Sequence, residues 1–155
     1  MFEENQIALK RFNGVERYAY TEGEYRYFIE GDKYVHNIEV FAEKPLQLLS
    51  DSVCQDCGGV HLAISIYSKN SKFSVLNEGL KFICSPVHTE IEEIIPYFVC
   101  CEHIELDNCE IEILKLQEGS IGIKITAKLW GPSYFGQDAS KTELYFKGKI
   151  PFIEG

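Results

Sequence analysis

Apolar and polar residues alternate one by one along two stretches of the chain, and this pattern limits the fold more than any other feature. Over residues 121–129 every second position is isoleucine, alanine or leucine, whereas Lys124, Thr126 and Lys128 lie between them. Residues 60–66 repeat the pattern with valine, leucine and isoleucine. Because successive side chains of a strand point to opposite faces of a sheet, both stretches predict half-buried antiparallel strands.

The chain is long enough for one domain with its own core. It has 155 residues, of which 45% are hydrophobic and 13% aromatic, a composition that disordered chains do not have. No internal repeat, low-complexity tract or proline- and serine-rich linker divides it. We therefore expect a single domain over residues 1–155.

The remaining segments predict a mainly β fold with little helix. One short helix is expected at about residues 89–95, because Ile91, Ile94 and Ile95 form an apolar stripe and Pro96 ends it. The predicted architecture is an antiparallel β-sandwich or a strongly curved sheet with this one helix. Further short strands are expected at Val15–Tyr20, Lys72–Leu76, Leu80–Cys84 and Thr142–Lys147.

A first hairpin can be aligned from its turn residues. Gly31 and Asp32 form a two-residue loop, in which glycine supplies the positive φ of a type II′ turn. Glu30 then faces Lys33, a favourable pair of opposite charges on neighbouring strands. One face of this hairpin is rich in tyrosine and consists of Tyr25, Tyr27, Ile29, Tyr34, His36 and Ile38.

A second hairpin is predicted to turn at Asp107-Asn108, because both residue types tolerate left-handed backbone. This register places Glu105 opposite Glu110, a like-charge pair that costs stability. On the same face His103 meets Glu112. Folding alone would not favour such an arrangement.

Acidic charge is concentrated in the same region. The net charge is −9, and residues 85–114 hold eight acids and no lysine or arginine. This charge argues against nucleic acid and against anionic membranes as partners. No apolar run approaches the ~20 residues that cross a bilayer, and the acidic start lacks the features of a signal peptide, so a cytoplasmic location is expected. The acids form a solvated face, a docking surface for a basic protein or, third, a site for a hard cation, although no D-x-D-x-D-G calcium pattern occurs.

The candidate partner-binding residues combine this acidic block with an aromatic loop. Trp130 and Tyr134 lie in a glycine-rich stretch, where they either fold over the core or serve as binding anchors. The full candidate set is Glu102, His103, Glu105, Asp107, Glu110, Glu112, Trp130 and Tyr134.

The six cysteines offer one weak metal motif. Cys54 and Cys57 have the C-x-x-C spacing that can bind zinc through two thiolates, with Cys101 and His103 as the remaining ligands. The alternative is that the cysteines are ordinary reduced residues, as expected in the cytoplasm. No other cofactor is expected.

Catalytic motifs are absent from the sequence, which favours a binding protein over an enzyme. No G-x-S-x-G, P-loop, G-x-G-x-x-G or H-E-x-x-H pattern occurs. The first hypothesis is a non-enzymatic protein that captures a basic partner. In type, though without a shared motif, such a chain resembles bacterial immunity proteins and antitoxins that neutralise a toxin. The alternatives are a small-molecule or zinc-binding β-domain and, third, an uncharacterised hydrolase; the oligomeric state is not predicted.

Overall fold

The computed structural model describes residues 4–11, 14–50, 59–84, 91, 93–99, 103–129 and 142–154, with only the backbone described at 103–105 and 107. Strands dominate this part of the chain, which confirms the mainly β prediction. Within it no helix has the length and apolar character needed to cross a membrane. The strands are β1 (Gln6–Arg11), β2 (Gly14–Ala19), β3 (Glu22–Glu30), β4 (Lys33–Ala42), β5 (Lys44–Gln47), β6 (Val60–Ser68), β7 (Lys81–Cys84), β8 (Glu93–Val99), β9 (His103–Gln117), β10 (Ser120–Leu129) and β11 (Thr142–Glu154).

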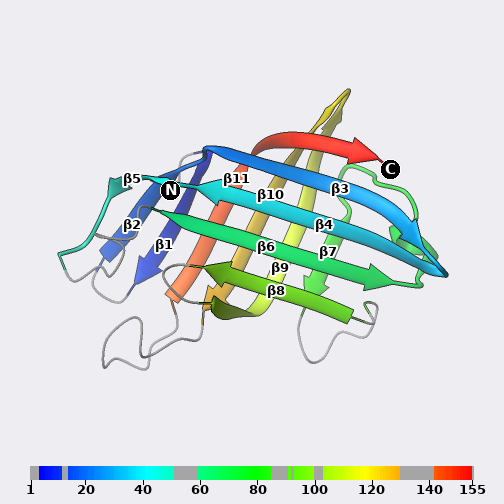
Figure 1. The fold of residues 1–155 in the computed structure, drawn as a ribbon, viewed down its shortest axis with the longest axis horizontal. Coiled ribbons are helices and arrows are strands. Elements are labelled where there is room, and N and C mark those ends of the chain that lie inside the picture. The colour runs from blue at the N-terminus through cyan, green and yellow to red at the C-terminus, as the bar shows by residue number, and fades with distance from the viewer. Residues whose placement is uncertain are drawn as a thin grey trace.

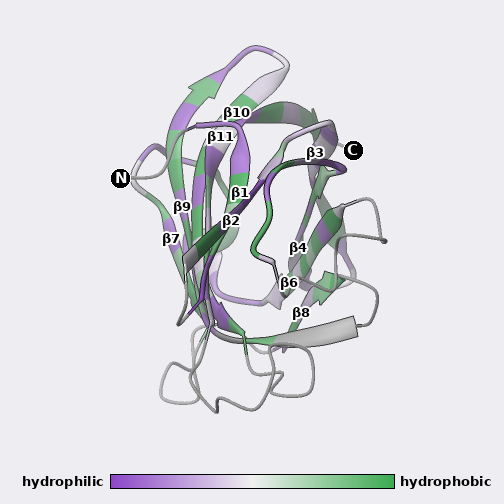
Figure 2. Ribbon diagram, turned by 90° about the vertical axis from the view of Figure 1, so that its left-hand side faces the viewer, coloured by the Kyte–Doolittle hydropathy of each residue, from purple (hydrophilic) through white to green (hydrophobic). Residues whose placement is uncertain are grey.

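The 11 strands form one strongly curved sheet in the order β10-β9-β8-β6-β4-β3-β11-β1-β2-β5, with β7 added on β9 and a further pairing of β10 with β11. Curvature brings the sheet into two layers. In Figure 1 strands β3, β4, β6 and β8 run side by side across the front layer, and β1, β2, β9, β10 and β11 cross behind them. Figure 2 shows the two layers from the side.

Two strands belong to both layers and join them. The first residues of β9 pair with β8 in the front layer, and the rest of β9 pairs with β10 in the rear layer. Strand β11 pairs with β10 as far as Pro151, and then Phe152–Glu154 run parallel to β3. The layers are therefore held together by continuous backbone hydrogen bonding as well as by side-chain packing.

The core lies between the layers and follows the alternation seen in the sequence. Along β6 and β10 buried residues alternate with half-buried or exposed ones, as predicted. Ile64 from the front layer and Ile123 from the rear layer are almost completely buried. Truncating either to alanine would cost about 2–5 kcal/mol, because it would remove buried methyl groups and leave a cavity.

The first predicted hairpin is confirmed residue by residue. Strands β3 and β4 pair Glu30 with Lys33 and Tyr27 with His36. Gly31 has φ 63°, the positive value that a II′ turn requires at its first central residue. The tyrosine-rich face of this hairpin points into the core at Tyr25, which is buried. Near the turn the same face is open to solvent, and Ile29 is 63% exposed.

The second predicted hairpin is wrong. Strand β9 continues through Asp107 and Asn108, and β10 pairs with it on both sides of this point. Asn108 has φ 51°, and the register shifts here between Thr126 and Lys128. The left-handed residue therefore makes a β-bulge that bends the strand instead of reversing the chain. Consequently Glu105 does not face Glu110.

The helix predicted at about residues 89–95 is also wrong where the structure describes it. Residues 93–95 belong to β8, and Pro96 pairs with Ile64 of β6. The proline is accommodated because β9 pairs with β8 only from Tyr97 onward. The preceding half of β8 is therefore an edge on the side of β9, where a residue without an N–H group breaks no ladder hydrogen bond. An apolar run this short fits a strand as well as a helix.

The strand expected at Lys72–Leu76 is replaced by a 3-10 turn at Ser71–Phe73. The Asn70 side chain accepts a hydrogen bond of 2.9 Å from the Lys72 amide and begins the turn. Phe73 is fully buried against the core, so its side chain fixes the loop on the sheet. This position brings the Phe73 carbonyl to His36.

Candidate partner-binding face

The predicted acidic block does not form a uniform negative surface. Glu110 and Glu112 lie on the outer face of β9, between the neighbouring strands β7 and β10. The Lys81 Nζ lies 3.9 Å from the Glu110 Oε1, and Glu112 pairs in register with both Lys81 and Lys124. By backbone register Asp107 faces Lys128. Lysines from the flanking strands therefore oppose these acids.

The other predicted partner-binding residues are placed only in part. Strand β9 contains His103 and Glu105, which pair by backbone register with Val99 and Tyr97 of β8. Glu102, Trp130 and Tyr134 lie outside the described residues. Their role stays a prediction.

The predicted zinc ligands cannot be assembled from the described part of the chain. Cys54, Cys57 and Cys101 lie outside it, and only the backbone of His103 is described. Elsewhere in the described ranges no three histidine, cysteine or acidic side chains come close enough to hold a metal ion. Zinc binding at Cys54 and Cys57 stays a prediction.

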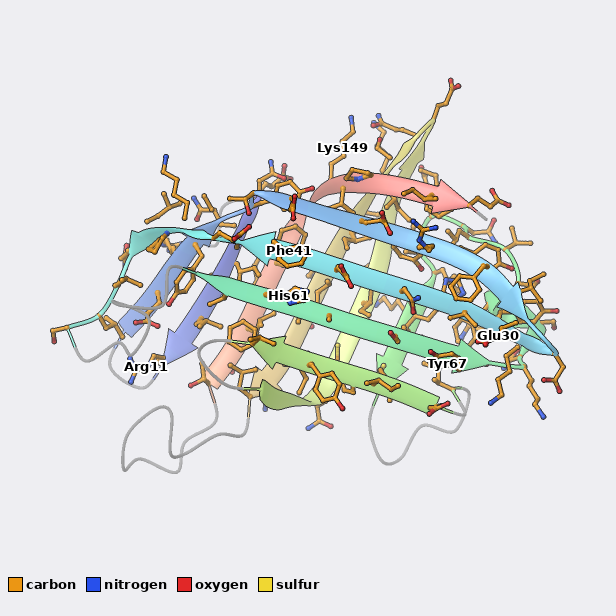
Figure 3. The ribbon with its side chains drawn as sticks, viewed as in Figure 1. Arg11, Glu30, Phe41, His61, Tyr67 and Lys149 are labelled. Carbon is orange, nitrogen blue, oxygen red and sulfur yellow. The ribbon has the colours of Figure 1, made fainter. Side chains whose placement is uncertain are left out.

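The structure instead reveals an apolar surface on the outer side of the front layer. Phe41 of β4 and His61 of β6 stack with ring centroids 3.9 Å apart, and Figure 3 shows them side by side on neighbouring strands. Tyr97 of β8 is 41% exposed and adjoins the small residue Ala63. We call this surface the aromatic face; its members are Phe28, Phe41, His61, Tyr67, Ile95, Tyr97 and Val99.

Carboxylates border the aromatic face along β3 and β4. Glu22 pairs in register with Phe41, and Glu24 lies directly opposite Glu39. The Arg26 Nε binds the Glu24 Oε2 at 3.0 Å. Among the described residues no cation lies within ion-pair distance of Glu22 or Glu39. This border therefore carries negative charge that the described chain does not neutralise.

The middle of the aromatic face holds an unsatisfied acceptor. Asn37 of β4 lies in register between Arg26 of β3 and Ser65 of β6. Its side-chain oxygen is buried and has no hydrogen-bond partner among the described residues. A buried acceptor without a donor costs about 1–3 kcal/mol of folding free energy.

Beneath this face the front layer contains a buried polar pair. The His36 Nε2 lies 3.0 Å from the carbonyl oxygen of Phe73, and its Nδ1 lies 2.9 Å from the Tyr25 hydroxyl. A carbonyl can only accept, so the Nε2 carries the proton and the Nδ1 accepts from Tyr25. Burial lowers the pKa of His36 from 6.5 to about 4, although the bond to Phe73 opposes this shift. His36 is thus neutral and structural at pH 7.

A second buried polar group lies at the opposite end, where β1 meets β2. The Arg11 Nη1 lies 3.7 Å from the Glu16 Oε2, and both side chains are buried. The Tyr18 hydroxyl and the Leu49 amide each donate to the Glu16 carboxylate at 3.2 Å. Because the carboxylate accepts from two separate segments, it fixes the chain at Leu49 against β2.

A pocket opens at one end of the two layers, where β11 reaches β3. It has a volume of about 310 Å³ and is mostly apolar. The Tyr27 hydroxyl at its wall donates to the Ser74 carbonyl at 2.6 Å. Glu154 is the acidic residue of the lining. The lining residues are Tyr27, Ser74, Val75, Leu76, Leu116, Gln117, Phe152 and Glu154.

We compared the chain with known protein families, curated proteins and solved structures. No known protein family, curated protein or solved structure matches this chain. The aromatic face was missed in the sequence because its residues occupy the outward positions of the strand alternation. Phe41, Tyr67 and Tyr97 at those positions were the available signal, since outward aromatics are enriched at binding surfaces.

Proposed function

We propose that the protein is a non-enzymatic, cytoplasmic binding protein that captures a basic protein partner through the aromatic face. The observation that carries this proposal is the presence, on one side of one layer, of half-exposed aromatic rings and of carboxylates that no cation of the described residues neutralises. Phe41 and Tyr97 provide apolar contact area, and Glu22 and Glu39 provide charge. An acidic antitoxin or immunity protein that neutralises a basic toxin is one protein of this class.

Arginine is the residue on the partner that this surface fits best. Its planar guanidinium stacks on aromatic rings and also pairs with carboxylates through two N–H groups. Lysine pairs with carboxylates only as a point charge. The Phe41–His61 stack lies beside Glu22 in register, so one guanidinium can reach both kinds of group.

Site-specific crosslinking in cells tests the proposal. A photoreactive residue at Tyr97 should trap a basic protein, and the same residue at Tyr145 should not, because Tyr145 lies on the outer side of the rear layer. The trapped species should become less abundant in the Glu22→Gln, Glu39→Gln variant. Equal trapping at both positions, or an acidic trapped protein, would contradict the proposal.

The end pocket favours a second function, the binding of a small aromatic cation. Tyr27 and Phe152 supply aromatic walls, and Glu154 supplies one carboxylate. Phenethylammonium should therefore shift the NMR signals of Tyr27 and Phe152, and Glu154→Gln should weaken this binding. The anion 3-phenylpropionate is the matched control, and stronger binding of the anion would rule out this function.

A further inference from the structure

We propose that Cys84 and Cys109 form a redox modification site, in which a low-molecular-weight disulfide such as oxidised glutathione converts the two thiols into a cross-strand disulfide. The site lies in the rear layer, away from the aromatic face, and is independent of the proposed function. Both cysteines are free thiols in the structure.

The sheet register brings the two cysteines together. Strand β7 pairs antiparallel with β9, and Cys84 lies directly opposite Cys109. Opposed residues of an antiparallel pair have Cα atoms about 4.5–5.5 Å apart, within the range of about 4.4–6.8 Å that disulfides span. Both side chains point inward, since Cys109 is buried and Cys84 packs on the core. The bond can therefore form with little movement of the backbone.

The two thiols already contact each other and differ in access. Cys84 is a hydrogen-bond partner of the Cys109 thiol, and this bond together with burial raises the pKa of Cys109 well above its usual value. Cys109 is almost completely buried, and Cys84 is partly exposed at the end of an edge strand. Because the thiolate is the reactive form and must reach its target, Cys84 attacks first and Cys109 second.

The reaction balances in two exchange steps. The Cys84 thiolate attacks one sulfur of oxidised glutathione, the glutathione S–S bond breaks, and one glutathione thiolate leaves. Cys109 then loses its proton to that thiolate, attacks the Cys84 sulfur and expels the second glutathione thiolate. Two protein thiols are oxidised and one glutathione disulfide is reduced. The product joins the short edge strand β7 covalently to β9.

Peptide mapping of the full-length protein tests this inference without any substitution. Cleavage after glutamate places the two cysteines in separate fragments, because Gly79–Glu90 holds Cys84 and Leu106–Glu110 holds Cys109. A third fragment, residues 94–102, holds Cys100 and Cys101. The protein is equilibrated with oxidised glutathione, alkylated, digested without reductant and analysed by mass spectrometry. We expect Gly79–Glu90 linked to Leu106–Glu110, with the loss of two hydrogen atoms.

Two variants distinguish this site from general thiol oxidation. Cys84→Ser should abolish the linked fragment. Cys109→Ser should leave Cys84 as a mixed disulfide with glutathione, about tenfold or more abundant than in the natural sequence, because the second thiol that displaces glutathione is missing. A stable mixed disulfide on Cys84 in the natural sequence would overturn the inference. Linkage of Gly79–Glu90 to residues 94–102, or complete alkylation of both thiols, would overturn it as well.

Discussion

The outer sides of the two layers differ in how their charges are arranged. On the aromatic face Glu24 lies opposite Glu39, and Glu22 lies beside Phe41. We call the outer side of β9, β10 and β11 the lysine face, because lysines on it oppose acids of the neighbouring strands, as Lys128 opposes Glu143; Lys124 opposes Glu112 on one side and Lys147 on the other. Its charged residues are Glu110, Glu112, Lys115, Lys124, Lys128, Glu143, Lys147 and Lys149; Figure 3 shows Lys149 on this rear layer.

This difference separates charge that supports the fold from charge that is available to a partner. Opposite charges facing each other on neighbouring strands contribute about 0.2–1 kcal/mol each, and like charges cost a similar amount. Lys128 faces Glu143 and therefore stabilises the sheet, whereas Glu24 and Glu39 repel each other. A net charge of −9 does not indicate which side of the molecule attracts cations; the cross-strand neighbours do.

The largest expected effect is a pH-dependent change in the free energy of unfolding, and it comes from His36 on the inner side of the front layer. Since burial lowers the pKa of His36 from 6.5 to about 4, the unfolded state binds more protons between these values. Stability is therefore fully present above pH 6.5 and falls as the pH drops toward 4. We expect a loss of about 2 kcal/mol between pH 7 and pH 5 from this residue. Urea unfolding at both pH values measures it.

His36→Gln is the informative variant, because glutamine can keep both hydrogen bonds and does not titrate. Its unfolding free energy should change less between pH 7 and pH 5 than that of the natural sequence. Lys128→Gln on the lysine face is the control and should keep the original pH dependence. Equal pH dependence in His36→Gln and the natural sequence would show that His36 is not the group that makes the fold acid-sensitive.

The next largest effect concerns the exposed tyrosines of the two faces. Truncating an aromatic anchor at a binding surface costs about 2 kcal/mol, or about 30-fold in Kd. Tyr97→Ala should weaken binding of the crosslinked partner by this amount. Tyr145→Ala on the lysine face should change it by no more than about twofold. Calorimetry with the purified partner measures both, and the reverse order would place the binding surface on the rear layer.

A smaller effect is expected from removing carboxylates in pairs. Glu22→Gln with Glu39→Gln should weaken partner binding by about tenfold at low salt, and the loss should shrink as salt is added. Glu110→Gln with Glu112→Gln removes the same charge where lysines oppose it, and should have little effect. If the second pair weakens binding more than the first, the acidic block of the sequence is the docking surface.

The smallest effect is on stability and has opposite signs on the two faces. Glu39→Lys replaces a like-charge pair with an attractive one against Glu24, and should stabilise the protein by about 0.5 kcal/mol. Lys128→Glu creates repulsion with Glu143, and should destabilise it by about the same amount. Urea midpoints in low salt measure both. Shifts of the same sign would mean that these charges do not act through cross-strand pairs.

Local signals in the sequence were sufficient for part of the fold. The β3–β4 hairpin was predicted in register, because a glycine turn and the residues beside it determine that pairing locally. Strands β6 and β10 were predicted because their alternation is strict. The bulge at Asn108 was not, because left-handed backbone suits a turn as well as a bulge, and the distant strand β10 decides between them. The helix prediction was wrong at residues 93–95 for a similar reason, because the pairing with the distant strand β6 decides between strand and helix there.

The candidate site needed contacts that the sequence does not encode locally. The acids of β9 were visible as a block, but the lysines that oppose them come from other strands. Phe41 and His61 are separated along the chain and meet only through the pairing of β4 with β6. Cys84 and Cys109 likewise become neighbours only once β7 is placed on β9.

The position of β1 has a consequence for how fast the protein can fold. Strand β1 pairs with β11, so Ile7 meets Phe146 from the far end of the described chain. Closing so long a loop costs much chain entropy before any contact compensates for it, and proteins with such distant contacts fold slowly. During synthesis β1 can pair with β2 at once, but its pairing with β11 must wait until β11 has left the ribosome, and until then the apolar side of β1 lacks its partners in the core. A chaperone that shields this strand would then speed the recovery of native protein.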